Sequence, residues 1–164
     1  MFKLLDRLSL ALARVTGWAV VLLAAVLVAS LAVSIFFRYV VGRALSWPEE
    51  ISLMLFAWLT LLSGSLGVRE NFHVRLTLLT DRLPPGAARS LEALTTMGVA
   101  LFGLVLLYSG ADLLARTMEH LTPTLRLSLD WVNGSAPVCG ALILVHALAR
   151  LGAPVRPDRR KERP

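Results

Sequence analysis

Two adjacent carboxylates, Glu49 and Glu50, are the clearest candidates for acid–base or cation-binding chemistry in this chain. Such a pair can act as acid and base only when both groups converge on one substrate atom. The residues just before them form a helix start, because Ser46 can cap the helix and Pro48 is tolerated in its first turn. Glu49 would then complete a capping box. Since neighbours on a helix point about 100° apart, the two carboxylates diverge, and the pattern favours capping and partner contact over catalysis.

The histidines and the single cysteine give little support for a metal or haem site. Haem held within membrane spans needs facing imidazoles, but only His146 lies inside an apolar run, whereas His73 and His120 fall in loops. Cys139 has no second thiol with which to form a disulfide or share a metal. The sequence also lacks a phosphate-binding glycine loop and the common hydrolase motifs. We therefore predict no catalytic, cofactor-binding or metal-binding residues.

Four long runs without any Asp, Glu, Lys or Arg determine the fold class. About 20 apolar residues in a helix cover the hydrocarbon core of a bilayer, and a mean hydropathy of +0.68 agrees with a membrane protein. We predict an all-α polytopic protein with four transmembrane helices, short interfacial helices and a single domain. The predicted spans lie at about 15–37, 48–68, 90–115 and 130–150 within a domain at 1–153, followed by a disordered basic tail at 154–164.

The 17 Lys and Arg residues predict the orientation of these spans. If the N-terminus is cytoplasmic, thirteen of them fall on the cytoplasmic side and four on the other. The positive-inside rule then places both termini in the cytoplasm. The basic residues responsible for the pI of about 10.7 flank the spans and do not form one patch. We therefore expect no nucleic-acid partner.

Several segments outside the spans have a recognisable character. Residues 1–14 fit either a short interfacial helix or a plain continuation of the first span, and both readings stay open. The loop at 69–89 mixes apolar and charged residues and is predicted to lie in the membrane interface. The third helix should run from Ser90 to the Thr122-Pro123 step, with a supporting pair at Asp112 and Arg116.

Small residues recur at helical spacing in two spans. Thr60 and Gly64, then Ser63 and Gly67, follow this pattern in the second span, and Ala136 and Gly140 repeat it in the fourth. Such faces let another helix approach closely, because lipid supplies no hydrophobic drive between helices. Packing within the chain and packing against a partner are both consistent with the pattern.

The order of these features resembles a known family over approximately residues 10–150. The chain is similar to the small permease subunit (DctQ-like) of tripartite ATP-independent periplasmic (TRAP) transporters. The first part of the resemblance comprises Arg38-Tyr39, Trp47, Glu49, Glu50, Trp58, Gly64, Gly67, Arg69, His73 and Leu83-Pro84, and the second comprises Thr122-Pro123, Leu125, Trp131 and Pro137. Two departures occur, since Thr77 stands where the family often has Asp, and Asn71 stands where glycine is common.

The resemblance implies a scaffold role in a bacterial inner-membrane complex. A periplasmic binding protein would capture a carboxylate-bearing solute, and a large multi-span subunit would move it inward, driven by a sodium gradient. The small subunit would pack against the large one through the small-residue face of its second span and help to dock the binding protein. The resemblance implies partner-contact or structural roles for Arg38, Trp47, Glu49, Glu50, Trp58, Gly64, Gly67, His73, Trp131 and Pro137. No cofactor is expected in this chain.

A membrane anchor of a redox complex is the alternative. Such an anchor would need bound haem. A small membrane enzyme is a third possibility, and it would need a cluster of polar catalytic residues in the spans. The interiors of the four runs contain no charged residue, although proton relays and transport sites usually need such groups. The sequence therefore favours an accessory subunit over a transporter or enzyme that works alone.

Overall fold

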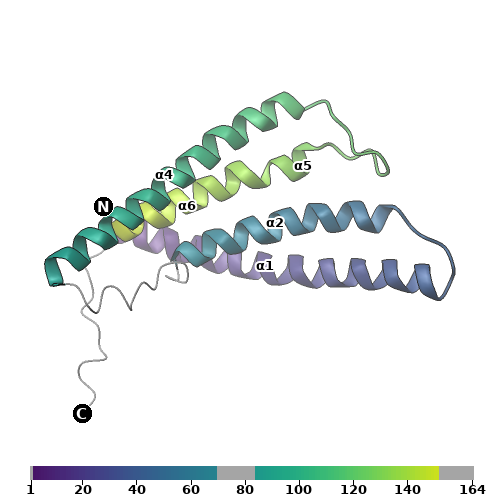
Figure 1. Ribbon diagram of the computed structural model, residues 1–164, viewed down its shortest axis with the longest axis horizontal. Helices are drawn as coiled ribbons and strands as arrows, with labels where there is room; N and C mark the ends of the chain where they lie inside the picture. The colour runs from purple at the N-terminus through teal and green to yellow at the C-terminus, as the bar shows by residue number, and fades with distance from the viewer. Residues whose placement is uncertain (1, 70–83, 152–164) are drawn as a thin grey trace, which may run out of the picture.

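Helices make up nearly all of the computed structural model, which describes residues 2–69 and 84–151 (Figure 1). The helices are α1 (Phe2–Tyr39), α2 (Trp47–Arg69), α4 (Pro85–Thr117), the one-turn α5 (Asp130–Asn133) and α6 (Ser135–Leu151). Four spans, with α5 and α6 counted together, are long and apolar enough to cross a membrane, and no strand occurs within the two described ranges. The prediction of an all-α protein with four spans is confirmed. The predicted tail and most of the predicted interfacial loop lie outside the described residues.

The N-terminal residues continue the first span. α1 runs without a break over 38 residues from Phe2 to Tyr39, so residues 2–14 are not a separate helix. At about 1.5 Å per residue it is roughly 57 Å long, nearly twice the ~30 Å hydrocarbon core. Beyond it, Gly42 has a φ of 71°, and the Arg43 amide donates to the Phe37 carbonyl at 3.0 Å. Glycine adopts this left-handed conformation without strain, which lets the chain turn back into α2.

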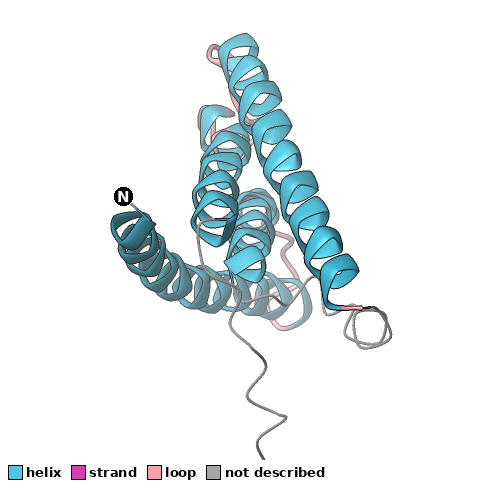
Figure 2. Ribbon diagram, turned by 90° about the vertical axis from the view of Figure 1, so that its left-hand side faces the viewer, coloured by secondary structure: helices cyan, strands magenta, loops and turns pink. Residues whose placement is uncertain are grey.

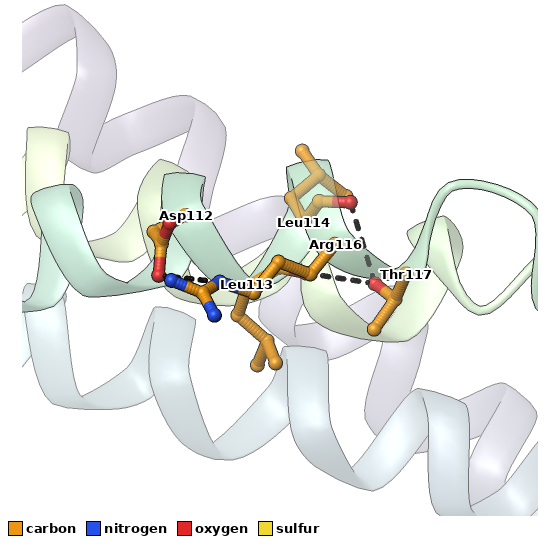
Figure 3. Close-up of polar contacts among 5 residues, drawn as sticks. All are labelled: Asp112, Leu113, Leu114, Arg116 and Thr117. Carbon is orange, nitrogen blue, oxygen red and sulfur yellow. Dashed lines mark hydrogen bonds and ion pairs between the residues drawn. The ribbon is translucent and has the colours of Figure 1, made fainter.

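The last turn of α4 is held by side chains from the same helix (Figure 3). Arg116 and Asp112 form the predicted ion pair, with 2.9 Å between Nε and Oδ2. The Thr117 hydroxyl donates to the carbonyls of Leu113 at 2.9 Å and Leu114 at 3.3 Å. Carbonyl groups in the last turn of a helix lack the usual backbone partner. The hydroxyl of Thr117 shares its proton between these two carbonyls, of which Leu114 is one of the last four in the helix.

α4 ends earlier than the sequence predicted. It was expected to reach the Thr122-Pro123 step, but its last residue is Thr117. Leu121 and Ser128 pair as an isolated antiparallel bridge, and the Thr122 amide donates to the Leu127 carbonyl at 2.8 Å. This pairing needs extended backbone, so the chain has to leave the helix before the proline. We call residues 121–128 the α4–α5 turn.

The four spans lie in a row rather than in a closed bundle. α1 packs on α2, α2 packs on α6, and α6 packs most extensively on α4, while α1 also touches α6. Figure 1 shows two helical hairpins, α1–α2 and α4–α6, which lie close together at one end and separate toward the other, and Figure 2 shows the same assembly turned by 90°. α6 therefore contacts all three other spans, whereas α1 and α4 form the edges of the row.

The side chains inside this row are mostly small or polar. Four of the five buried hydrophobic residues lie in α6, and large apolar residues such as Trp18, Leu53 and Tyr108 face outward. Lipid does not drive apolar groups inward, but polar groups in hydrocarbon need partners. The buried polar residues are Ser9, Thr16, Ser30, Ser34, Ser52, Ser65, Thr96, Thr122, Ser135 and His146.

Glycines bring α4 and α6 into backbone contact. A Cβ placed on Gly140 would lie 2.5 Å from the Leu107 amide nitrogen, and one on Gly103 would lie 2.7 Å from Cγ2 of Ile143. Both distances are shorter than any real contact of a Cβ, so only glycine fits there. The spacing of small residues had pointed to Gly140, but it had not singled out Gly103 on the partner helix.

The fourth span is interrupted one turn before its proline. Pro137 was expected to kink it, because a proline has no N–H to donate to the carbonyl four residues earlier. That carbonyl belongs to Asn133, the last residue of α5, and α6 begins at Ser135. Between them, the Gly134 amide still donates to the Asp130 carbonyl at 2.8 Å. The two helices therefore continue one another across a local break.

We expect Gly140→Ala to destabilise the subunit. The new methyl group would overlap the backbone of Leu107, which cannot rotate away, and overpacking of this kind costs about 1–3 kcal/mol. Thermal unfolding of the purified chain in mild detergent should show a lower midpoint. Gly98→Ala is the matched control, since a Cβ there meets no atom within 4 Å, and its midpoint should be unchanged or slightly higher. Equal midpoints for the two variants would contradict the close helix contact.

Candidate functional site

The first pair of predicted site residues closes the turn between α1 and α2. Nη2 of Arg38 lies 2.5 Å from Oε1 of Glu49, and the two side chains are 50% and 60% exposed. The prediction that Glu49 turns back onto Ser46 in a capping box is wrong. The guanidinium offers a charge-assisted hydrogen bond, which is stronger than one to a neutral backbone N–H. Because both groups are half exposed, the pair fixes geometry more than it adds stability.

Glu50 binds a different element from its neighbour. Its carboxylate accepts hydrogen bonds from the backbone amides of Leu125 at 2.7 Å and Thr124 at 3.4 Å. This contact ties the start of α2 to the α4–α5 turn. The two glutamates thus diverge, as expected for adjacent helix positions, and do not form an acid–base pair.

Trp58 joins α2 to the start of the fourth span. Its indole N–H donates to the Trp131 carbonyl at 2.5 Å. The side chain of Trp131 itself is 64% exposed, and that of Trp47 is 38% exposed. Trp47 is the first residue of α2, and Trp131 is the second residue of the one-turn α5. Exposed indoles at helix ends are typical of the aromatic belts at membrane interfaces.

The remaining predicted site residues lie elsewhere. A Cβ on Gly64 would meet no atom within 4 Å, and Gly67 follows it on α2, half-buried. Pro137 packs against α4, where its Cδ would lie 2.8 Å from a Cβ on Gly110. His73 lies outside the described residues. The nine residues that the structure describes therefore do not converge on one point, and most of them connect one helix to another.

A second polar cluster, at the other end of the row, was missed by the sequence analysis. Arg69, the last residue of α2, donates to Oγ of Ser9, and that oxygen lies 2.8 Å from Nδ1 of His146. Arginine only donates, so the Ser9 hydroxyl accepts from Arg69 and is shared with the imidazole of His146. The cluster joins α1, α2 and α6. Among the described residues, Nε2 of His146 is buried without a partner.

The sequence did contain a signal for this cluster. Ser9 and Thr16 are seven residues apart in α1, so they share one helix face, and both are buried. Polar residues at such spacing within an apolar helix mark the side that packs against other helices. From the sequence, His146 had been considered only as a possible haem ligand.

These contacts connect helices and do not build a reaction centre. Within residues 2–69 and 84–151, no group of three or more His, Cys, Asp or Glu could hold a metal ion. Cys139 is a buried thiol that donates to the Leu61 carbonyl of α2 at 2.9 Å. The polar side chains are thus engaged in holding the spans together.

Comparison with known proteins identifies the family. The family model described as "Tripartite ATP-independent periplasmic transporters, DctQ component" matches residues 27–156. The chain belongs to this family. The match includes α2, the loop after it, α4 to α6 and the last third of α1, and it confirms the resemblance seen in the sequence. Members of the DctQ family are subunits of transporters and not enzymes.

Individual relatives of this DctQ component agree with that assignment. The sialic acid TRAP transporter small permease protein SiaQ of Vibrio cholerae is 28% identical over 129 residues, which cover 79% of this chain and 75% of SiaQ. A putative TRAP transporter small permease protein of Haemophilus influenzae is 27% identical over 114 residues, 70% and 71% of the two chains. The C4-dicarboxylate TRAP transporter small permease protein DctQ of Vibrio cholerae is 30% identical over 78 residues, 48% of this chain and 33% of that protein.

We expect Ser9→Ala to loosen the contact between α1, α2 and α6 in this DctQ component. The change leaves both Arg69 and His146 without their shared partner, and a buried polar group that loses its hydrogen bond costs about 1–3 kcal/mol. The midpoint of chemical unfolding in detergent should fall accordingly. Ser109→Ala removes an exposed hydroxyl from α4 and should leave it unchanged. If Ser9→Ala also leaves the midpoint unchanged, the polar cluster does not hold the helices.

Proposed function

We propose that this chain is the small scaffold subunit of a TRAP-type secondary transporter in a bacterial inner membrane, with both termini in the cytoplasm. The family match over residues 27–156 carries the proposal. The distribution of positive charge supports the orientation. The subunit itself moves no solute. The large permease subunit provides the transport path and the sodium coupling, and no cofactor is bound by the small one.

The large permease subunit packs against one face of α2. Thr60 and Ser63 are exposed on this face, and a Cβ on Gly64 would meet no atom within 4 Å. The opposite side of α2 is already occupied, since Leu62 and Ser65 are buried. Lipid acyl chains cannot form hydrogen bonds with hydroxyl groups. Another helix can approach small residues closely and form hydrogen bonds with their hydroxyl groups. This difference favours a protein as the neighbour of the Thr60–Gly64 face.

The periplasmic binding protein docks at the end formed by the α1–α2 loop and the α4–α5 turn. Glu50 connects the two, so together they present one surface held at a fixed geometry. The names of the relatives refer to sialic acid and C4-dicarboxylates. Both are carboxylic acids, which supports a carboxylate-bearing organic solute for this transporter as well.

Co-purification with the large subunit tests the packing proposal. Gly64→Leu should leave the small subunit itself folded, because a Cβ at that position would meet no atom of the described residues within 4 Å. In the complex the new side chain would clash with the large subunit at a cost of about 1–3 kcal/mol, roughly a 5- to 150-fold loss of affinity. The yield of the large subunit on a tagged small subunit measures this loss. Gly98→Leu is the control on α4, where the chain also leaves space. Wild-type yield with Gly64→Leu would contradict the assigned face.

Binding of the periplasmic protein tests the docking proposal. Glu50→Ala frees the α4–α5 turn from α2, and we expect a several-fold weaker interaction between the binding protein and the detergent-solubilised complex. Asp112→Ala is the matched control, because it removes a carboxylate near the same end that pairs only within its own helix. The yield of the large subunit should be normal in both variants. Unchanged binding with Glu50→Ala would show that the turn is not part of the docking surface.

A further inference from the structure

One face of α1 carries two arginines at the end of the row where the N-terminus lies. Arg7 and Arg14 are seven residues apart and therefore lie on the same side of the helix, with Ala11 between them. All three residues are exposed. At about 100° per residue, this face lies roughly 180° from the side of α1 that holds Ser9 and packs against the rest of the chain. The two arginines thus point away from the protein.

The contacts of Ser9 place these arginines at the edge of the membrane. Ser9 bonds to Arg69, the last residue of α2. Because α2 has 23 residues and is therefore about 34 Å long, its end lies at one boundary of a hydrocarbon core about 30 Å thick. Arg7 lies about 3 Å from the level of Ser9 along α1 on the side of the N-terminus, and Arg14 lies about 7.5 Å inside it.

The two arginines stand on either side of Ala11, about 10.5 Å apart along the helix axis. Long helical side chains lean toward the N-terminus, so Arg14 reaches back from the hydrocarbon toward the membrane boundary. The small side chain of Ala11 leaves the space between them open. Within the part of the chain that the structure describes, neither arginine forms an ion pair. Two positive charges on one face at a membrane boundary attract the anionic head groups of lipids.

A large aromatic side chain continues the same face into the membrane. Trp18 is four residues beyond Arg14 and is 74% exposed. Trp18 lies nine residues beyond Ser9, about 13.5 Å deeper along the helix, where it faces the acyl chains. Further along, Leu22 is also exposed. The face therefore changes from charged to apolar with depth, as a phospholipid does from its head group to its acyl chains.

We propose that Arg7 and Arg14 hold the phosphate of an anionic phospholipid over Ala11, with its acyl chains lying against Trp18. A carboxylate from a protein partner would satisfy the charges but not the ordered change to apolar surface below them. The site is separate from the Thr60–Gly64 face of α2, and it does not depend on which partner binds there.

Lipid retention by the purified complex tests this site. The full chain, purified with the membrane partners that accompany it, is stripped with detergent and titrated with phosphatidylglycerol or with phosphatidylcholine of the same chain length. Native mass spectrometry counts the bound lipid. We expect tighter binding of phosphatidylglycerol, and Arg7→Gln/Arg14→Gln should weaken it by about tenfold or more, to the level of phosphatidylcholine. Arg43→Gln/Arg126→Gln removes the same charge from exposed positions in the α1–α2 loop and the α4–α5 turn, at the other end of the spans, and should leave lipid binding unchanged.

A second variant keeps both charges. Ala11→Leu fills the space between the arginines on an exposed helix position, and we expect it to reduce phosphatidylglycerol binding while the complex stays intact. Equal binding of the two lipids by the wild type, or unchanged binding in both variants, would overturn the proposal. Displacement of the lipid by inorganic phosphate would indicate a site for free anions instead. If the variants lose the large subunit from the purified complex but still bind phosphatidylglycerol, a protein and not a lipid covers this face.

Discussion

The backbone contact between α4 and α6 is the constraint on which the arrangement of the spans depends. Water drives apolar side chains together in a soluble protein, but lipid gives helices no such reason to associate. Gly140 and Gly103 remove the side chains that would keep these two helices apart. Short-range dispersion forces then act along the line of contact. Since α6 also touches α1 and α2, the position of every span follows from where α6 lies.

Hydrogen bonds fix the two ends of this row. At one end, the Ser9 hydroxyl connects Arg69 to His146, so three helices share a single polar group. At the other end, Glu50 holds the α4–α5 turn against α2 through backbone amides. A surface formed from two loops can be recognised as one only if the loops keep a fixed relation. The same bonds that stabilise the fold therefore also shape the surface proposed for docking.

The sequence predicted the class of fold better than its geometry. Four uncharged runs are enough to predict four spans, because the length of a run and the thickness of a bilayer are independent of any contact. The pair of Asp112 and Arg116 was also predictable, since it is local to one helix. By contrast, Glu49 was expected to cap its own helix, and its bond to Arg38 depends on how α1 and α2 turn toward each other. The role of Ser9 depends on three helices meeting, which spacing along one helix cannot reveal.

The central place of α6 has a consequence for how the protein is made. Membrane proteins emerge from the ribosome N-terminus first, and α6 is the last of the described helices to leave it. It is also the most buried of the four spans, whereas α1 is the most apolar. α1 can enter the bilayer unaided. Until α6 is inserted, the glycines of α4 that will contact it face lipid. Assembly of the whole subunit is thus completed only by its final span, and a nascent chain halted before that point has three inserted helices but no common core to join them.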